Sequence, residues 1–361
     1  MKIGLLTLPV SENYGGILQC VALYNYLKHQ GHDVVLLYKV NDAPLWKSVI
    51  KRLFSYIPFY DFKNLKSNYK KKIFHLPFVN YCISHKSANL KSTEDLSAAV
   101  KKYHLDAVVV GSDQVWRLRY INDKYYKSFF LDFVDDEVKK IAYAASFGKD
   151  YWEGKGDEAE IGRLLERFDY ISVREESGID ICKNTFGVTK DVHHVLDPTM
   201  LWSKEFYMSL MPSNSFNKKI SLLTYVLDEA DDKKRIISAC IEKREILPDN
   251  VLHLKGFGDK KRYYTVPEWL EAFSKADFIV TDSFHGVVFS IIFNKQFVAI
   301  ANKDRGLDRF ISLLGMFNLK DRLIFDSDFN PECFKSDIDY NNVNCKVAEQ
   351  QKESLGFLKG L

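Results

Sequence analysis

The sequence predicts an α/β protein made of two doubly wound domains, each a parallel β-sheet covered by helices on both faces. Strand-like apolar runs alternate with helix-like segments through most of the 361 residues, which is the pattern of repeated βαβ units. A chain of this length with 46% hydrophobic residues can bury two cores. The polar stretch Met211–Lys219 is the candidate linker. We expect the carboxyl edges of the two sheets to face one cleft, the usual place for a ligand in such folds.

The first predicted domain covers residues 1–210 and begins as a βαβ unit. Ile3–Leu8 is a predicted strand, and Ile17–Gln30 has the periodicity of a helix that ends at Gly31. A basic and aromatic insertion follows the second strand, at about residues 41–100. The other predicted strands of this domain are Val34–Tyr38, Asp106–Val110, Ile141–Ala145, Tyr170–Val173 and Val192–Leu196.

The second predicted domain covers residues 220–335 and repeats the alternation. Its predicted elements are strands at Ser221–Leu227, Val251–Leu254, Phe278–Val280 and Phe297–Ile300, and helices at Asp232–Glu245, Pro267–Phe273 and Val287–Phe293. Residues 336–361 form a C-terminal tail that we expect to be helical.

Composition excludes several classes of protein. The formal charge of +3 is too balanced for a dedicated nucleic-acid binder, so no nucleic-acid partner is expected. The six cysteines are far apart and lack the spacing of zinc ligands or redox pairs, which indicates buried thiols in a reducing cytoplasm. The first residues lack the continuous apolar core of a signal peptide. No apolar run reaches the roughly 20 residues needed to cross a bilayer.

Positive charge is concentrated between Trp46 and Lys72, which holds eight basic residues, one acidic residue and several aromatic rings. Such a segment suits anionic lipid headgroups or a lipid-linked substrate, which would place the protein peripherally at the inner face of the membrane. The alternative, which composition favours, is a solvated pair of basic helices packed on its aromatic side.

The most informative motif is the polar turn Thr281–Gly286 between a predicted strand and a predicted helix. The start of that helix offers unpaired N–H groups and the positive end of its dipole to an anion. Ser283 or Asp282 is expected to cap the helix, and Gly286 to let a ligand approach the backbone. His285 places a titratable imidazole at the same rim, although a histidine after a strand is often only a packed ring.

Three further candidates follow strands of the first half. Tyr14-Gly15-Gly16 before a helix suits a phosphate or forms only a tight turn, and it lacks the G-x-G-x-x-G and G-K-[ST] patterns of nucleotide binders. Asp113 is a candidate base or ligand of a sugar hydroxyl, with helix capping as the alternative. Trp116 either offers a face for a sugar ring to stack on or belongs to the core.

Arg174 directly follows a predicted strand, where its guanidinium can bind a carboxylate or phosphate through two parallel hydrogen bonds. An ion pair with Glu175 or Glu176 is the alternative. His193 and His194 have no third ligand at a suitable spacing, so no metal site is expected. The G-x-S-x-G pattern of a nucleophile elbow is missing from the sequence, and hydrolytic chemistry therefore has no support.

As an ordered set, these motifs resemble the signature of the polysaccharide pyruvyl transferase family. The segments that carry the resemblance are Tyr14–Gln19, Gly111–Trp116, Tyr143–Gly148, Ser172–Glu175, Leu196–Thr199 and Asp282–Gly286. Each is short, but their order and spacing across about Ile3–Phe310 make the set specific.

The resemblance implies two Rossmann-like domains arranged as in the GT-B glycosyltransferases, with a cleft between them. It also implies phosphoenolpyruvate as the donor, whose pyruvyl group is placed as a ketal across two hydroxyls of a sugar in exopolysaccharide biosynthesis. The acceptor would be a sugar or a lipid-linked oligosaccharide. Arg174 falls on the arginine that holds the donor in this family, and His285 falls on the histidine of the C-terminal motif.

The expected site combines these residues, with no metal and with phosphoenolpyruvate as a donor substrate in place of a cofactor. The predicted roles are catalysis by His285 as general acid and by Asp113, donor binding by Arg174, Ser283, Phe284, Gly286, Gly15 and Gly16, and acceptor binding by Tyr14 and Trp116. Some members of the family have an arginine where this chain has Ser283. The candidates for the missing charge are Lys255, Lys303, Arg305 and Arg309.

Two other functions fit the same architecture. One is a GT-B glycosyltransferase that uses a nucleotide sugar. The other is a non-catalytic partner in polysaccharide assembly, which Ser283 and the basic aromatic segment make plausible.

Overall fold

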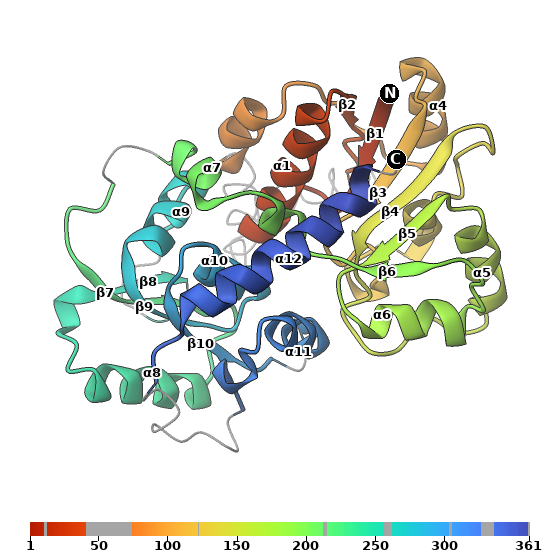
Figure 1. Cartoon of the computed structure of the whole chain (residues 1–361). Helices are drawn as coiled ribbons and strands as arrows, with labels where there is room; N and C mark the ends of the chain where they lie inside the picture. Colours follow the sequence, from red (N-terminus) through yellow and green to blue (C-terminus); the bar gives the residue numbers. More distant parts are fainter. Residues whose placement is uncertain are drawn as a thin grey trace, which may run out of the picture. The chain divides into compact units, whose positions relative to one another are not determined.

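The computed structural model describes most of the chain as two compact units (Figure 1). The described residues are 1–10, 13–40, 74–121, 123–211, 215–255, 257, 262–302, 305–325 and 336–359. The first unit comprises Met1–Ser146, Trp152–Val173 and Cys182–His193, and the second comprises Phe147–Tyr151, Arg174–Ile181 and His194–Leu361. The basic aromatic segment at 46–72 and Lys303 lie outside the described residues.

The first unit is built on a six-stranded sheet with the order β2-β1-β3-β4-β5-β6. Pairing from β2 through to β5 is parallel throughout. Every residue of β3 is buried, which fits a central strand covered on both faces. The strands are β1 Lys2–Leu6, β2 Asp33–Leu36, β3 Ala107–Gly111, β4 Lys139–Ala145, β5 Tyr170–Val173 and β6 Val192–His194.

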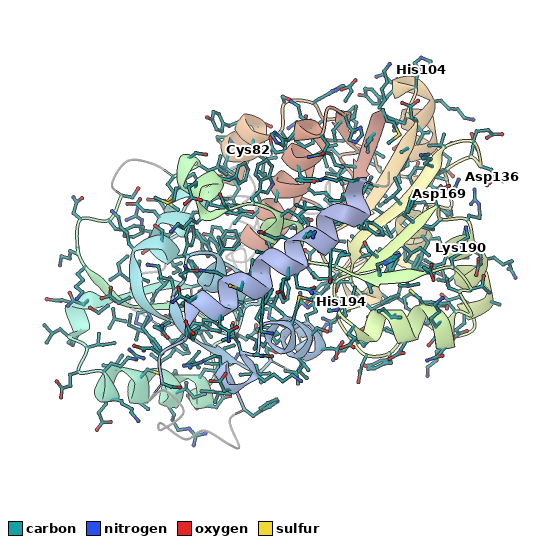
Figure 2. All side chains as sticks on the ribbon, viewed as in Figure 1. Cys82, His104, Asp136, Asp169, Lys190 and His194 are labelled. Atoms are coloured by element: carbon teal, nitrogen blue, oxygen red, sulfur yellow. The ribbon has the colours of Figure 1, made fainter. Side chains whose placement is uncertain are left out.

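Local signals in the sequence begin and end the helices of this unit. Helix α1 (Tyr14–His29) begins where the side chain of Asn13 accepts a hydrogen bond from the backbone N–H of Gly15. Helix α4 (Thr93–Tyr103) begins with a reciprocal capping box and ends at His104, which adopts the left-handed conformation and is labelled in Figure 2. The other elements are α5 Glu158–Glu166, the 3₁₀ turns η1 Leu118–Tyr120 and η2 Asp123–Phe130, the π turn η3 Ile181–Thr185 and a helix at 74–82.

The order of strands in the first unit changes direction between β1 and β3, because β2 adds on one side and β3 to β6 add on the other. Such a switch point is where doubly wound sheets bind ligands. Buried side chains join the two strand ends there. The amide of Gln19 donates to Thr7 Oγ1 at 2.9 Å and accepts from the backbone N–H of Ser112 at 3.0 Å. Residues 13–16 and Asp113 therefore lie at this switch point.

The second unit is built on a five-stranded parallel sheet with the order β11-β10-β9-β7-β8. Apolar residues of β7, β9 and β10 form one core with helix α8. The strands are β7 Ile220–Tyr225, β8 Val251–Lys255, β9 Ala276–Thr281, β10 Gln296–Ile300 and β11 Leu323–Ile324. The helices are α6 Ser177–Asp180, α7 Lys204–Ser209, α8 Asp231–Lys243, α9 Val266–Lys275, α10 Phe284–Ile292, α11 Leu307–Met316 and α12 Tyr340–Lys359, with the 3₁₀ turns η4 Pro198–Leu201, η5 Pro248–Asn250 and η7 Lys320–Arg322.

The switch point of the second sheet lies between β7 and β9, since β8 adds on one side and β10 and β11 add on the other. The motif at 281–286 is at this point, between β9 and α10. A Cβ atom at Gly286 would lie only 2.3 Å from Thr281 Oγ1. Gly286 is therefore required for the close approach of α10 to the end of β9. The glycine thus has a packing role, and its predicted contact with the donor stays a prediction.

The observed architecture agrees with the predicted fold class, two Rossmann-like units of alternating strands and helices. The predicted cleft concerns the placement of one unit relative to the other and stays a prediction. The units separate earlier in the chain than the predicted linker at Met211–Lys219, because Arg174–Ile181 and the chain from His194 onward belong to the second unit. Among the described residues, no helix has the length and apolarity needed to span a membrane.

Replacing Gly286 by alanine should destabilise the protein by about 1–3 kcal/mol, because the new methyl group would push against Thr281 at the end of the strand. Gly356→Ala in α12 is the matched control, since nothing lies within 4 Å of a Cβ built there and alanine is the better helix former. Urea unfolding of both variants measures the difference. A Gly286→Ala protein as stable as wild type would contradict this packing.

Candidate functional site

The start of α10 is defined by Ser283. The backbone of Ser283 is extended, and its hydroxyl accepts a hydrogen bond from the N–H of Gly286 at 3.4 Å. The backbone N–H of Ser283 in turn donates to Thr281 Oγ1 at 3.1 Å. Of the two caps expected from the sequence, Ser283 is thus the one used. This position serves helix geometry in the structure, and its predicted contact with the donor stays a prediction.

Asp282 fixes the loops around the switch point. Its fully buried carboxylate accepts two hydrogen bonds of 2.6 Å, one from the backbone N–H of Leu227 and one from the ammonium group of Lys233. The amide of Asn302 lies 3.4 Å from the same carboxylate. These partners come from the loop after β7, from α8 and from the chain after β10, so Asp282 ties three segments to the start of α10.

Arg174, Asp197 and His285 meet within the second unit. The guanidinium Nη1 of Arg174 donates to Asp197 Oδ2 at 2.7 Å, and Nε2 of His285 lies 3.4 Å from the same oxygen. The side chains of Arg174 and Asp197 are buried, and that of His285 is 6% exposed. One carboxylate thus joins the guanidinium and the imidazole, the two groups on which the functional prediction depends most.

Asp197 is held in its charged form. Its other oxygen, Oδ1, accepts hydrogen bonds from the backbone N–H of Thr199 at 3.0 Å and from the hydroxyl of Thr199 at 2.7 Å. Burial alone would raise the pKa of the Asp197 carboxyl group, but the charges of His285 and Arg174 and the hydrogen bonds to Thr199 outweigh burial and hold this pKa well below its ordinary value. The site therefore contains a carboxylate that is charged at neutral pH and is paired with the guanidinium of Arg174.

Two arginines lie against the ring of Phe284. The guanidinium carbon of Arg174 is 4.7 Å from the ring centroid, and that of Arg309 is 5.1 Å from it. Both guanidinium groups are buried, and Arg309 also donates to the backbone carbonyl of Arg305. Phe284 thus has two guanidinium groups against its ring, and the centroid of this ring lies 5.2 Å from that of His285. Its side chain is 4% exposed, so its contribution to a donor site is mainly this placement.

The other candidates for the missing charge are placed differently. Arg305 donates to Asp228 at 2.7 Å, and the hydrogen bond from Arg305 is the largest of the effects that lower the pKa of that carboxyl group. Lys255 is exposed at the end of β8. Lys303 lies outside the described residues. Among the described candidates, Arg309 is the one whose guanidinium shares the Phe284 ring with Arg174.

The predicted residues of the first unit gather at its own switch point. A Cβ atom at Gly16 would lie 3.3 Å from Oδ2 of Asp113, so this carboxylate lies close to the start of α1. The ring of Tyr14 contacts that of His75 edge-on, with 5.0 Å between centroids. A carboxylate beside Gly16 disfavours a second anion there. The surroundings of Gly15 and Gly16 are thus better suited to hydroxyl groups than to the phosphate of a donor.

Trp116 belongs to the core of the first unit. Its side chain is fully buried, its ring stacks on Phe130 with 5.3 Å between centroids, and its Nε1 donates to the carbonyl of Phe129 at 2.8 Å. A ring packed in this way has no face for a sugar. The prediction of acceptor binding by Trp116 is therefore wrong, and the packing alternative is correct.

The structure brings Arg174, Ser283, Phe284 and His285 together in one unit, and Tyr14, Gly15, Gly16 and Asp113 together in the other. Asp197 is the residue that sequence reasoning missed as a site member. Its signal was present, because it is the aspartate of the motif Leu196–Thr199. His194, labelled in Figure 2, hydrogen bonds through Nε2 to the backbone carbonyl of Arg174 at 3.1 Å.

Two Rossmann-like units and a charged site at the carboxyl edge of the second sheet define a protein of the GT-B-like class. The sequence profile of the family described as polysaccharide pyruvyl transferase matches residues 13–304. The chain therefore belongs to the polysaccharide pyruvyl transferase family, which indicates a transferase. No curated protein matches the sequence.

Comparison with solved structures finds similar chains of low identity. A protein from Listeria monocytogenes assigned as a UDP-N-acetylglucosamine 2-epimerase has 9% identity and a TM-score of 0.51, with 97% of this chain and 90% of that chain covered. The UDP-GlcNAc 2-epimerase of Neisseria meningitidis has 11% identity and a TM-score of 0.49, with 100% of both chains covered. The first likeness supports the fold alone.

Asp197→Asn should destabilise the protein by about 3–5 kcal/mol, because it removes a charge partner of a buried guanidinium while keeping the shape of the side chain. Asp277→Asn is the matched control. It breaks an exposed ion pair with Lys219 and should cost less than about 1 kcal/mol. Urea unfolding at neutral pH compares the two, and equal losses of stability would contradict a structural charge at Asp197.

Acidification should weaken the fold through His194. Burial lowers the pKa of His194, and the carbonyl of Arg174 and the carboxylates of Glu176 and Asp308 oppose this effect only in part. The folded pKa therefore lies below the ordinary value of about 6.5, so the unfolded chain binds the proton more readily. Stability is then fully present above that value and is lost as the pH falls from about 7 to about 5.

His194→Gln keeps an N–H donor toward Arg174 but cannot take up the proton, so it should reduce this loss of stability. The measurement is the urea midpoint at both ends of the pH range. An unchanged pH dependence in His194→Gln would exclude His194 as its source.

Proposed function

We propose that this protein transfers the pyruvyl group of phosphoenolpyruvate to two hydroxyls of a sugar, forming a ketal in surface polysaccharide biosynthesis. The observation that carries the proposal is the joint contact of Arg174 and His285 with Asp197, in a chain that belongs to the polysaccharide pyruvyl transferase family. The arrangement supplies a cation for the donor and a proton donor beside it, and both are fixed by one buried carboxylate.

The donor would bind next to Phe284. Phosphoenolpyruvate carries a carboxylate and a phosphate, so its site needs several positive groups. Arg174 and Arg309 supply two guanidinium groups on one aromatic ring, and the start of α10 adds the positive end of a helix dipole. In this arrangement Arg309 supplies the charge that some family members obtain from an arginine at the position of Ser283.

His285 would act as the general acid. The carboxylate of Asp197 lies 3.4 Å from Nε2 and would hold the imidazole in place, with Nδ1 turned toward the donor. Transfer of this proton to the methylene carbon of phosphoenolpyruvate makes a methyl group and an electrophilic C2. One sugar hydroxyl adds to C2, and the second hydroxyl then displaces the phosphate. One hydroxyl proton replaces the proton given by His285, and the other leaves with the phosphate.

The acceptor would bind through residues of the first unit. Asp113 and Tyr14 lie at the switch point of that sheet, and a carboxylate and a phenol are both suited to sugar hydroxyls. Asp113 would orient or deprotonate the hydroxyl that attacks. The scheme uses no metal and no cofactor besides the donor, because the arginines and the helix dipole stabilise the leaving phosphate.

Phosphoenolpyruvate at saturating concentration should raise the thermal unfolding temperature of the full-length protein by a few degrees. Arg174→Gln should abolish this protection, because the variant loses the cation that holds the donor. Uridine diphosphate is the comparison ligand. Protection by uridine diphosphate and none by phosphoenolpyruvate would instead support glycosyl transfer from a nucleotide sugar.

His285→Ala should lower the rate of phosphate release from phosphoenolpyruvate in the presence of acceptor sugars by about 10²–10⁴-fold. It should leave protection by phosphoenolpyruvate largely intact. His193→Ala, which changes an exposed histidine, is the matched control and should keep the wild-type rate. Near-wild-type release by His285→Ala would rule out this general acid, and sugar binding without any release would support a non-catalytic partner.

A further inference from the structure

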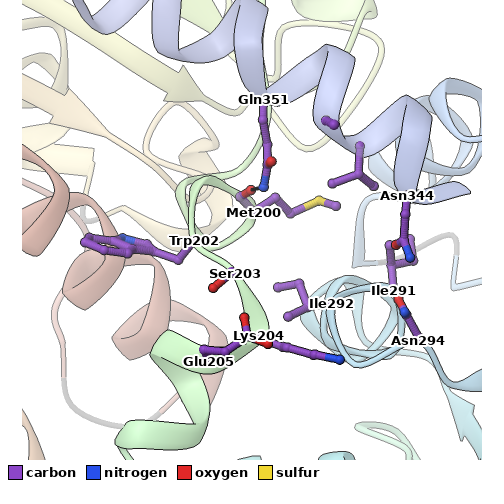
Figure 3. Close-up of a pocket in the computed structure, with 12 residues that line it drawn as sticks. Met200, Trp202, Ser203, Lys204, Glu205, Ile291, Ile292, Asn294, Asn344 and Gln351 are labelled. Carbon is purple, nitrogen blue, oxygen red and sulfur yellow. Dashed lines mark hydrogen bonds between the residues drawn. The ribbon is translucent and has the colours of Figure 1, made fainter.

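The segment that carries Asp197 is tied at both ends to the C-terminal helix α12. The buried hydroxyl of Ser354 accepts a hydrogen bond from the backbone N–H of Leu196 at 3.0 Å. The side-chain amide of Gln351 donates to the backbone carbonyl of Met200 at 2.6 Å. Figure 3 shows Gln351 reaching from α12 toward Met200. Ser354 and Gln351 are three residues apart and therefore lie on one face of the helix.

Ser354 is a polar residue at a buried position of α12. The buried positions of α12 are Val343, Ser354 and Leu358, so Ser354 is the polar residue among them. It accepts the hydrogen bond of the backbone N–H of Leu196, the residue directly before Asp197. A hydroxyl at this position therefore has a specific partner, and that partner adjoins the carboxylate of the site.

Another bond holds the middle of the same segment. The hydroxyl of Tyr207 donates to the carbonyl of Thr199 at 2.7 Å. The segment 196–200 is thus held before, within and after the turn that presents Asp197. Two of these three contacts come from α12, which begins at Tyr340. The family profile ends at residue 304, so nothing in the family match assigns a role to this helix.

We propose that Ser354 and Gln351 are positioning residues that set the place of the Asp197 carboxylate, and through it the orientation of Arg174 and His285. Neither residue touches the proposed reacting groups. The rate should be sensitive to the 3.4 Å contact between His285 and Asp197, because a displacement of about 1 Å at a catalytic group is enough to lower the rate about 10²-fold. The catalytic part of this inference rests on the proposed function, whereas the placement of Asp197 does not.

Gln351 gives the cleaner test because it is only partly buried. It lines a cavity of about 280 Å³ with Met200, Lys204, Asn344 and other residues, so its truncation removes a hydrogen bond without opening the core (Figure 3). Gln350→Ala is the matched control. Gln350 is the same residue type on the same helix, and its amide donates only to Glu353 in the next turn among the contacts described.

The experiment compares full-length wild type with Gln351→Ala, Ser354→Ala, Ser354→Thr and Gln350→Ala. Hydrogen exchange followed by mass spectrometry is measured on peptides that cover residues 195–202, 174–181 and 282–290. We expect faster exchange at all three sites in Gln351→Ala and Ser354→Ala, wild-type exchange in Gln350→Ala, and partial rescue in Ser354→Thr, which retains a hydroxyl. In phosphate release, kcat should fall about 10-fold to 100-fold, with partial recovery in Ser354→Thr.

The exchange readout separates the inference from the proposed function. If exchange rises at 174–181 and 282–290 while wild type releases no phosphate, the positioning role stands and the proposed function fails. If wild type is active and Gln351→Ala matches it in exchange and in kcat, the positioning role is overturned. If Ser354→Ala does not fold, Gln351→Ala alone decides between these outcomes.

Discussion

The structure of the site depends on a carboxylate that is buried away from water. A charge in that position is stable only if cations and hydrogen-bond donors surround it, and Asp197 receives both, from Arg174, His285 and Thr199. The same requirement places a guanidinium and an imidazole within reach of one oxygen. Stabilising the buried charge of Asp197 thus brings together Arg174 and His285, the two residues that the proposed reaction uses.

The two switch points divide the functional groups by charge. In the second unit, Arg174 and Arg309 share the ring of Phe284 next to the start of α10, which suits an anionic donor. In the first unit, the carboxylate of Asp113 lies beside the start of α1, which suits hydroxyl groups and disfavours another anion. This division follows from side-chain chemistry alone and fits a reaction with one charged and one hydroxylic substrate.

Much of the fold was predictable from the sequence because buried parallel strands form continuous apolar runs, as in β3 and β9. The position of His285 after a strand was predictable for the same reason. Asp197 was harder to recognise, because an aspartate before proline and threonine also fits an ordinary turn. Its partner Arg174 lies 23 residues earlier, and spacing along the chain does not reveal that contact. The prediction for Trp116 was wrong because its burial depends on contacts with Phe130 and Phe129, and the sequence alone does not show where these two residues lie.

The two ion pairs around the second switch point differ in their access to water, and dissolved ions should therefore affect them unequally. Lys233 and Asp282 are almost fully enclosed, whereas Arg305 and Asp228 are 34% and 46% exposed. Mobile counterions screen exposed charges strongly and enclosed charges weakly. In concentrated electrolyte the outer pair would loosen first, while the inner pair would keep the loops after β7 and β9 joined.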